Sequence, residues 1–185
     1  MEALSRLTEV DREVYRRGVE RYQRQIADWN AARDPRDPST DIPDATPTGD
    51  LHFDQAIPGG GWMNREWSDD GSAFCWMGST RRAWVEMAAE GRQRSLVVEI
   101  LHAVDDEVLT GLRLSVDGRT VPHALAEADG AVVASAPLPR RRLPRRTRLV
   151  SIEVERSRHP REVNPESTDN RELAIAVRRI ALQPS

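Results

Sequence analysis

Residues 149–156, Leu-Val-Ser-Ile-Glu-Val-Glu-Arg, alternate between apolar and polar side chains along most of their length. Successive side chains of a β-strand point to opposite faces of a sheet, so an alternation with a period of two predicts a strand with one buried face. Val150, Ile152 and Val154 are then expected to lie on one face of the strand, and Ser151, Glu153 and Glu155 on the other. This stretch has the clearest strand pattern in the chain, and the fold assignment starts from it.

The chain after residue 50 contains further short segments of the same kind. Residues 112–116 alternate in the same way, and Asp117-Gly118 after them is a hairpin-type turn that leads into residues 119–121. Other strands are predicted at residues 95–103, 131–135 and 173–182, whereas residues 84–87 are too short to assign. No segment after Ala32 has the period of a helix. The pattern favours an all-β fold, an antiparallel β-sandwich of jelly-roll type, over an α/β sheet.

One amphipathic helix is predicted before the sandwich, over residues 1–33. Its apolar side chains recur at spacings of four and three and form a stripe along one face: Tyr15, Val19, Tyr22, Ile26 and Trp29. Residues 34–50 follow as a proline-rich linker, because four prolines among acidic and hydroxyl residues exclude a helix or an interior strand. Residues 51–185 then form the sandwich domain. The stripe is expected to dock on that domain or to pair with another copy of the chain.

The composition restricts the classes of partner. The chain has 185 residues, which suits one compact domain with an appendage, and a net charge of −3, which gives no basic field to attract nucleic acid or an anionic membrane. No apolar run is long enough to span a membrane, and the N-terminus lacks the apolar core of a secretory signal, so a cytoplasmic location is expected. The single cysteine, Cys75, excludes an intramolecular disulfide and a zinc site built from cysteines.

Four of the five tryptophans fall within 23 residues: Trp62, Trp67, Trp76 and Trp84. Indole is a large apolar surface that is costly to expose, and it also stacks well on sugar rings, so such a cluster belongs to a core or to a binding site. Trp76 shares one face of a short strand with Phe74, and a strand that is apolar on both faces predicts a core position for it. Trp62 and Trp67 lie among polar residues, which predicts a rim position where an indole face can stack on a sugar.

Other candidate residues have a structural interpretation. Gly59-Gly60-Gly61 lacks the sequence context of a phosphate-binding loop and is expected to be a flexible entry to the first strand. Cys75 is expected to be a buried thiol, and residues 69–72, Asp-Asp-Gly-Ser, are expected to form a turn. The arginine-rich segment 140–148 is expected to be a solvated loop. The four histidines have no ligand spacing, so no metal or other cofactor is predicted, and no acid–base pair or triad indicates an enzyme.

Four motifs together resemble a β-sandwich module of bacterial surface-polysaccharide systems that is often appended to glycosyltransferases and sugar-modifying enzymes. They are Gly-Trp-Met-Asn-Arg-Glu at 61–66, Phe-Cys-Trp-Met-Gly at 74–78, Leu-Ser-Val-Asp-Gly at 114–118 and Asp-Asn-Arg-Glu-Leu-Ala-Ile-Ala-Val at 169–177. The resemblance covers residues 53–182. Two positions depart from the module's pattern: Cys75 stands where the module usually has arginine, and Ala174 stands where it has glycine.

The resemblance implies glycan recognition or scaffolding by a galactose-binding-like sandwich. The expected function is therefore a non-catalytic carbohydrate-binding or scaffolding module in cell-surface polysaccharide biosynthesis, with a glycan and a glycosyltransferase or exporter component as partners. The candidate ligand-binding residues are Trp62, Glu66, Trp67 and Arg171. Glu66 and Arg171 have a second interpretation, a buried ion pair that joins the first and last strands of the domain. An adaptor that uses only the N-terminal helix, with the sandwich as its scaffold, is the alternative function.

Overall fold

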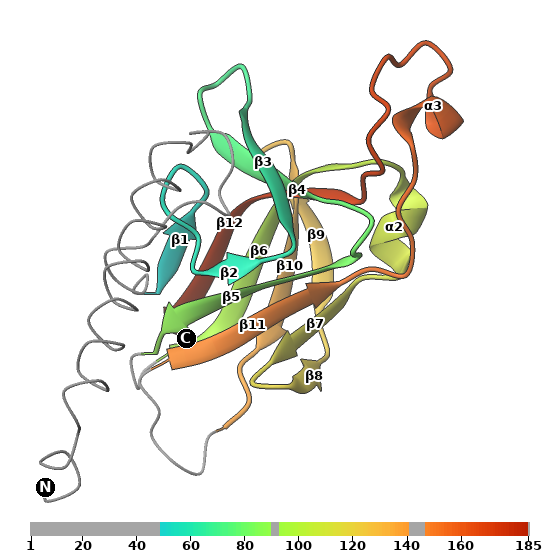
Figure 1. Ribbon diagram of the computed structural model, residues 1–185. Helices are drawn as coiled ribbons and strands as arrows, with labels where there is room; N and C mark the ends of the chain where they lie inside the picture. Colours follow the sequence, from blue (N-terminus) through green and yellow to red (C-terminus); the bar gives the residue numbers. More distant parts are fainter. Residues whose placement is uncertain (1–48, 90–92, 141–146, 185) are drawn as a thin grey trace, which may run out of the picture. The chain divides into compact units, whose positions relative to one another are not determined.

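The computed structural model describes residues 49–89, 93–140 and 147–184, and these residues form two antiparallel β-sheets (Figure 1). The first sheet contains seven strands: β1 (Asp50–His52), β3 (Trp62–Trp67), β4 (Ala73–Met77), β6 (Gln93–Ala103), β9 (Ala124–Ala128), β10 (Ala131–Pro137) and β12 (Ile175–Pro184). The second sheet contains five strands: β2 (Gly59–Gly60), β5 (Arg82–Ala88), β7 (Arg113–Val116), β8 (Arg119–Val121) and β11 (Thr147–Glu153). The prediction of an all-β domain made of antiparallel sheets is confirmed.

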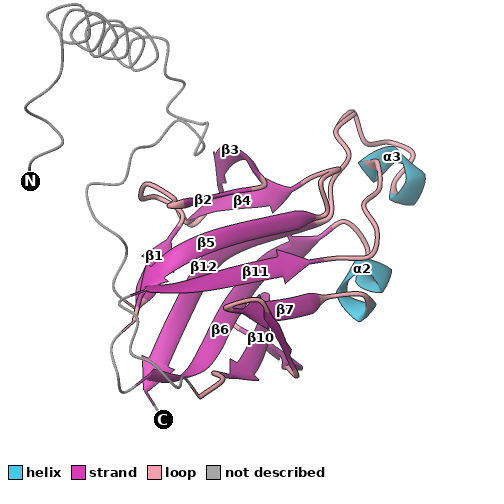
Figure 2. Ribbon diagram, turned by 60° about the horizontal axis from the view of Figure 1, so that its bottom comes forward, coloured by secondary structure: helices cyan, strands magenta, loops and turns pink. Residues whose placement is uncertain are grey.

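Strand β11 contains residues 149–153 of the alternating stretch and pairs with β5 on one edge and β7 on the other. Val150, Ile152 and Val154 are buried, as the alternation predicts. Figure 2 shows β5, β11 and β7 passing in front of β12, β6 and β10. One hydrophobic cluster draws residues from both sheets, among them Met77, Leu96, Ile100 and Ile180 of the first sheet and Val85, Leu114, Val150 and Ile152 of the second. The two sheets therefore face each other across a shared core.

Strand β12 joins the two halves of the first sheet. Strand β6 pairs with one edge of β12, while β4 and β1 share the other edge. Arg178 is an extra residue in β12, because its neighbours Val177 and Arg179 pair with consecutive residues of β6. This β-bulge shifts the alternation by one residue, so Val177 and Ile180 both face the core and the two arginines between them lie on the outer face.

Strand β6 contains a bulge of its own. Ala176 and Val177 are consecutive on β12, but they pair with His102 and Ile100, so Leu101 is the extra residue on β6. In a regular strand His102 would face the core together with Ile100, because the two are separated by two residues. The bulge instead brings His102 to the outer face of the sheet, where its side chain is exposed.

The Gly59-Gly60-Gly61 segment is part of the second sheet, which corrects its prediction as a flexible entry. Gly59 and Gly60 form β2 and pair with Val85 and Trp84 of β5. A Cβ atom on Gly59 would lie 1.9 Å from the carbonyl oxygen of Trp84, and Gly61 has a φ of 86°, a conformation that favours glycine. Glycine is required here because the chain passes close to β5 before it crosses to β3 in the first sheet.

Trp62 lies in the core, which corrects the prediction of a rim position. Its side chain is only 9% exposed, and its ring meets that of Phe53 edge-on at a centroid distance of 4.8 Å. Its Nε1 donates a hydrogen bond to the carbonyl oxygen of Trp84 at 3.3 Å. Trp62 pairs across the sheet with Met77, which faces the core, and a register shift follows it within β3. Trp67, at the end of β3, is 52% exposed, so its predicted exposure is confirmed.

The predicted helix at residues 1–33 and the predicted linker up to residue 48 lie outside the described residues, as does most of the segment 140–148. Two short helices, which the sequence did not predict, occur in connecting segments: α2 (Asp106–Thr110) and α3 (Pro160–Val163). Helix α2 begins after Asp105, whose Oδ1 accepts a hydrogen bond from the backbone N–H of Val108 at 2.9 Å. Neither of these described helices has the length and apolar content to cross a membrane.

Replacing Trp62 with alanine is expected to lower the free energy of unfolding by about 3–5 kcal/mol, because it leaves a cavity beside Phe53. Urea denaturation followed by circular dichroism measures the loss. The matched control is Trp67→Ala, which is expected to stay within about 0.5 kcal/mol of the wild type because that indole is exposed. Equal losses in the two variants would contradict a core position for Trp62.

Candidate functional site

A cavity of about 410 Å³ opens on the outer face of the first sheet, where β3, β4 and β6 meet the segment that precedes β12. Its aromatic and charged lining residues are Glu66, Phe74, Trp76, His102, Asp169 and Arg171. Alternation along β4 places Phe74 and Trp76 on this face, while Cys75 and Met77 belong to the core. The sequence predicted this division of faces, although it did not predict that the face with Trp76 would border a cavity.

The floor of the cavity is a group of three aromatic rings. Trp76 on β4 and His102 on β6 both pair with Ala176 of β12, which lies between them. Because the methyl group of Ala176 is small, the two rings lean over it and stack, with centroids 6.2 Å apart and ring planes at 20°. Phe74 stands nearly perpendicular to both, 6.5 Å from Trp76 and 5.7 Å from His102. The result is an aromatic group of two stacked rings with a third, nearly perpendicular ring beside them.

The rim of the cavity is a clasp of three charged side chains, Glu66, Asp169 and Arg171. Arg171 Nη1 donates to Glu66 Oε1 at 2.5 Å, and Arg171 Nη2 donates to Asp169 Oδ2 at 2.7 Å. The Nε and the backbone N–H of Arg171 also donate to Asp169 Oδ1, at 3.0 and 2.9 Å. The ion pair that the sequence suggested is therefore present.

Two details of the predicted pair are corrected. The clasp is not buried, because its three side chains are 30–38% exposed. It also does not join the first and last strands, because Arg171 lies four residues before the start of β12. The clasp instead ties β3 to the segment that leads into β12. Since its groups are in contact with solvent, they remain accessible to a ligand.

The contacts of the clasp shift the pKa values of two of its members. Hydrogen bonds from the Arg171 side chain are the largest influence on Asp169 and lower the pKa of its carboxyl group below the ordinary value of 3.8. Hydrogen bonds to Asp169 and then to Glu66 raise the pKa of the Arg171 guanidinium. Two carboxylates face one guanidinium, so the clasp has a net charge of −1. This charge favours a neutral or cationic ligand over an anionic one.

One wall of the cavity is formed by α3 and the residues that follow it, and hydrogen bonds within this segment hold it. The backbone N–H of Ser167 donates to the carbonyl oxygen of Asn164 at 2.9 Å, and that of Asp169 donates to Ser167 Oγ at 3.2 Å. His159 Nδ1 lies 3.0 Å from the carbonyl oxygen of Asn170. These local contacts place Asp169 where it can accept from Arg171.

The cavity contains two of the four predicted ligand-binding residues. Glu66 and Arg171 line it, whereas Trp62 is in the core and Trp67, although exposed, is not among the lining residues. The tryptophan that lines the cavity is Trp76, for which the sequence predicted a core position.

Trp76 is only partly buried, because the outer face of β4 is bordered by the cavity and not by a second packed layer. The sequence analysis also missed His102 and Asp169. The spacing of Asp169 and Arg171 could have identified that pair, since an aspartate often binds the backbone N–H two residues later. No local signal could have identified His102, because its position depends on the bulge at Leu101.

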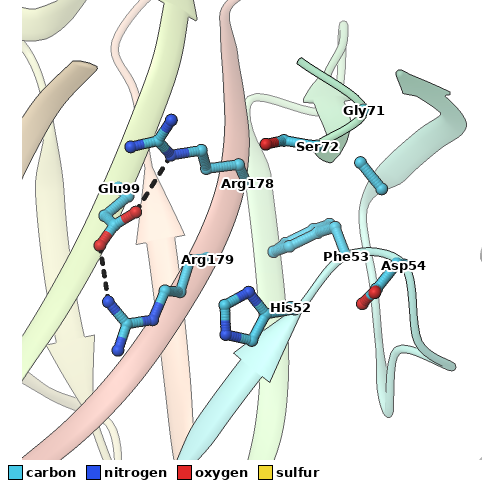
Figure 3. A pocket seen from close by; sticks show the side chains of 9 residues that line it. His52, Phe53, Asp54, Gly71, Ser72, Glu99, Arg178 and Arg179 are labelled. Carbon is cyan, nitrogen blue, oxygen red and sulfur yellow. Dashed lines mark hydrogen bonds and ion pairs between the residues drawn. The ribbon is translucent and has the colours of Figure 1, made fainter. Parts of the chain in front are cut away.

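A second cavity, of about 360 Å³, lies beside the bulge in β12 (Figure 3). Glu99 accepts hydrogen bonds from Arg178 Nε at 3.0 Å and from Arg179 Nη1 at 2.8 Å. Arg179 also donates to the two carboxylate oxygens of Asp50, at 2.7 and 2.8 Å. Each of the two arginines is thus paired with a carboxylate, and the network links β1, β12 and β6. We assign this cavity a structural role.

The remaining candidate residues have the structural roles that the sequence predicted. Cys75 is fully buried. The predicted turn is present: Asp70 Oδ1 accepts hydrogen bonds from Ser68 Oγ at 2.5 Å and from the backbone N–H of Ser72 at 2.8 Å. These bonds lower the pKa of Asp70 to about 2. Within residues 49–89, 93–140 and 147–184, no three histidine, cysteine or acidic side chains are arranged to hold a metal ion.

Comparison with known proteins assigns no family: neither a protein-family model nor a curated protein matches this chain. The geometry and chemistry of the aromatic cavity and its clasp are therefore the basis on which a function is inferred.

Replacing Asp169 with asparagine is expected to lower the free energy of unfolding at neutral pH by at most about 1 kcal/mol, because a partly exposed pair with Arg171 is lost. Since folding lowers the pKa of Asp169, its stabilisation is complete well above pH 3.8 and is lost as the pH falls through the lower folded-state pKa. Urea denaturation between about pH 7 and pH 3 should therefore show a difference in the free energy of unfolding between wild type and variant, a gap that closes on acidification. Glu166→Gln, an exposed change in the same segment, is the control and should show no gap. A gap that does not change with pH would contradict the clasp.

Proposed function

We propose that this protein is a non-catalytic carbohydrate-binding module, a galactose-binding-like jelly roll that acts in cell-surface polysaccharide biosynthesis beside a glycosyltransferase or an exporter. The observation that carries the proposal is the stacked pair of Trp76 and His102 next to the charged clasp. A sugar ring has an apolar face of C–H groups and an edge of hydroxyl groups. An aromatic floor with carboxylates at its rim complements both parts.

The motifs that resemble the polysaccharide-associated module support this assignment. Glu66 belongs to the motif at 61–66, Phe74 and Trp76 to the motif at 74–78, and Asp169 and Arg171 to the motif at 169–177. These three motifs are far apart in the sequence, yet each contributes to the lining of one cavity. Residues from three of the four motifs are thus the ones that would contact the glycan.

The clasp suits a neutral glycan. Its net charge of −1 repels a sugar that carries a carboxylate, and its carboxylate oxygens can accept hydrogen bonds from sugar hydroxyl groups. Arg171 is engaged by Glu66 and Asp169 at once, so an anionic ligand would have to displace one of them. The proposed ligand class is therefore a neutral or amino-sugar-containing polysaccharide.

The same geometry favours binding over hydrolysis. A general acid needs a carboxyl group whose pKa is raised toward neutrality, whereas contacts with Arg171 lower the pKa of Asp169. Glu66 shares the same guanidinium and is held at the rim. The environment of Asp169 is therefore not that of a proton donor, which supports a module that binds without catalysis.

Trp76→Ala is expected to weaken glycan binding about 10- to 100-fold, the usual effect of removing a central aromatic contact. Calorimetric titration of the full chain with neutral bacterial surface polysaccharides and with carboxylated ones measures the change, and the neutral set should bind more tightly. Near-ultraviolet circular dichroism verifies the fold of the variant.

The matched control is Trp67→Ala, which removes an exposed indole that does not line the cavity and should retain wild-type affinity. Unchanged affinity in Trp76→Ala, or loss of binding in Trp67→Ala alone, would refute the cavity as the glycan site.

A further inference from the structure

The outer face of the second sheet carries another exposed indole, Trp84, in the middle of β5. Its side chain is 42% exposed, and it lies in a shallow hollow of about 590 Å³. The hollow is lined by Gly61, Thr80, Arg82, Trp84, Leu149 and Ser151. Leu149 on β11 is the other large apolar residue in this lining. The feature belongs to the sheet that does not contain the aromatic cavity, so it is a separate surface.

The position of Trp84 in the sheet is fixed from both sides. Gly60 of β2 pairs with it on one side and Ser151 of β11 on the other. The position that a Cβ atom would occupy on Gly60 lies 3.2, 3.5 and 3.7 Å from Nε1, Cε2 and Cζ2 of the indole. One edge of the indole thus lies over Gly60. Because glycine has no side chain, the ring has room to lie against the sheet.

The backbone of Trp84 is equally constrained. Its carbonyl oxygen accepts a hydrogen bond from the buried Trp62 and lies so close to Gly59 that no side chain fits between the two strands. A ring that is held by its own backbone and by the strand beneath it loses little conformational freedom when a ligand binds.

The edge of the hollow is polar. Arg82 and Glu153 form an ion pair at 3.1 Å, and Thr80 Oγ1 donates to the carbonyl oxygen of Arg82 at 3.3 Å. Ser151, which also lines the hollow, is only 5% exposed. The lining therefore combines one indole and one aliphatic side chain with the hydroxyl group of Thr80 and the guanidinium of Arg82, which is paired with Glu153. A protein partner requires a larger apolar centre than two side chains provide, whereas a single sugar ring matches this area and this mixture of groups.

We infer that the hollow around Trp84 is a second sugar-binding surface, open and flat, on the sheet opposite the aromatic cavity. It extends the proposed function from one glycan site to two, because the two sites lie on different sheets and can engage two glycan segments. Two weak sites on one chain raise the overall affinity for a polymer through effective concentration without any new contact. Sugar binding at Trp84 does not depend on sugar binding in the cavity at Trp76.

The test is residue-specific protection of tryptophan in the full chain. N-bromosuccinimide oxidises accessible indoles, and peptide mass spectrometry reads Trp67, Trp76 and Trp84 separately. The probes are three neutral hexasaccharides: the β-1,4-linked hexamers of glucose, mannose and N-acetylglucosamine. At saturation, at least one probe is expected to slow the oxidation of Trp84 about 10-fold, while Trp67 serves as the internal control and is not protected.

Variants assign the protection. Arg82→Ala is expected to weaken the protection of Trp84 about 10-fold and to leave the protection of Trp76 unchanged. Gly60→Val, which displaces the indole of Trp84, should abolish the protection of Trp84. Protection of Trp76 without Trp84 would overturn the second surface and leave the proposed function intact. Protection of Trp84 without Trp76 would support the second surface and refute the cavity. If none of the three probes protects Trp84, the second surface is overturned.

Discussion

Strand β12 is the constraint on which the aromatic cavity depends, because its backbone is paired along both edges. β6 occupies one edge, and β4 and β1 divide the other, so the strands that supply Trp76, His102 and the link to Glu66 are all positioned through it. An unpaired buried N–H or C=O group is costly, and full pairing of β12 leaves the neighbouring strands little freedom in register. The small residue Ala176 then sets the spacing at which the two rings of the cavity floor meet.

Two β-bulges determine which side chains reach the outer face of this rigidly paired sheet. A bulge shifts the alternation of side chains by one residue, and here the shifts move His102 on β6 and the arginine pair on β12 to the outer face. The apolar residues before and after each bulge still reach the core, so the outer face gains polar and aromatic groups without loss of packing. Glu99 and Asp50, which pair with Arg178 and Arg179, balance the charges that this arrangement places on the sheet.

The tryptophan cluster is divided among four environments. Trp62 packs on Phe53 in the core, Trp67 is exposed at the end of an edge strand, and Trp76 and Trp84 lie on the outer faces of different sheets. Trp84 separates from the other three because the chain crosses from the first sheet to the second after β4, and the register shift within β3 separates the buried Trp62 from the exposed Trp67. The buried Trp62 also holds the backbone of the exposed Trp84, since Trp62 Nε1 donates a hydrogen bond to the carbonyl oxygen of Trp84. One short stretch therefore supplies core packing and both of the proposed sugar-binding surfaces.

The sequence by itself determined the most regular strands and the faces of their side chains. The alternation in residues 149–156, the turn at Asp117-Gly118 and the split of Phe74 and Trp76 from Cys75 are local properties, because a strand presents its side chains with a period of two wherever it is placed. It also identified Glu66 and Arg171 as partners. The tertiary structure alone decided that Trp62 is buried, that His102 joins Trp76 and that Gly60 lies beneath Trp84. These outcomes depend on bulges, registers and crossings between sheets, which are set by pairing between distant segments and leave no mark in the local pattern.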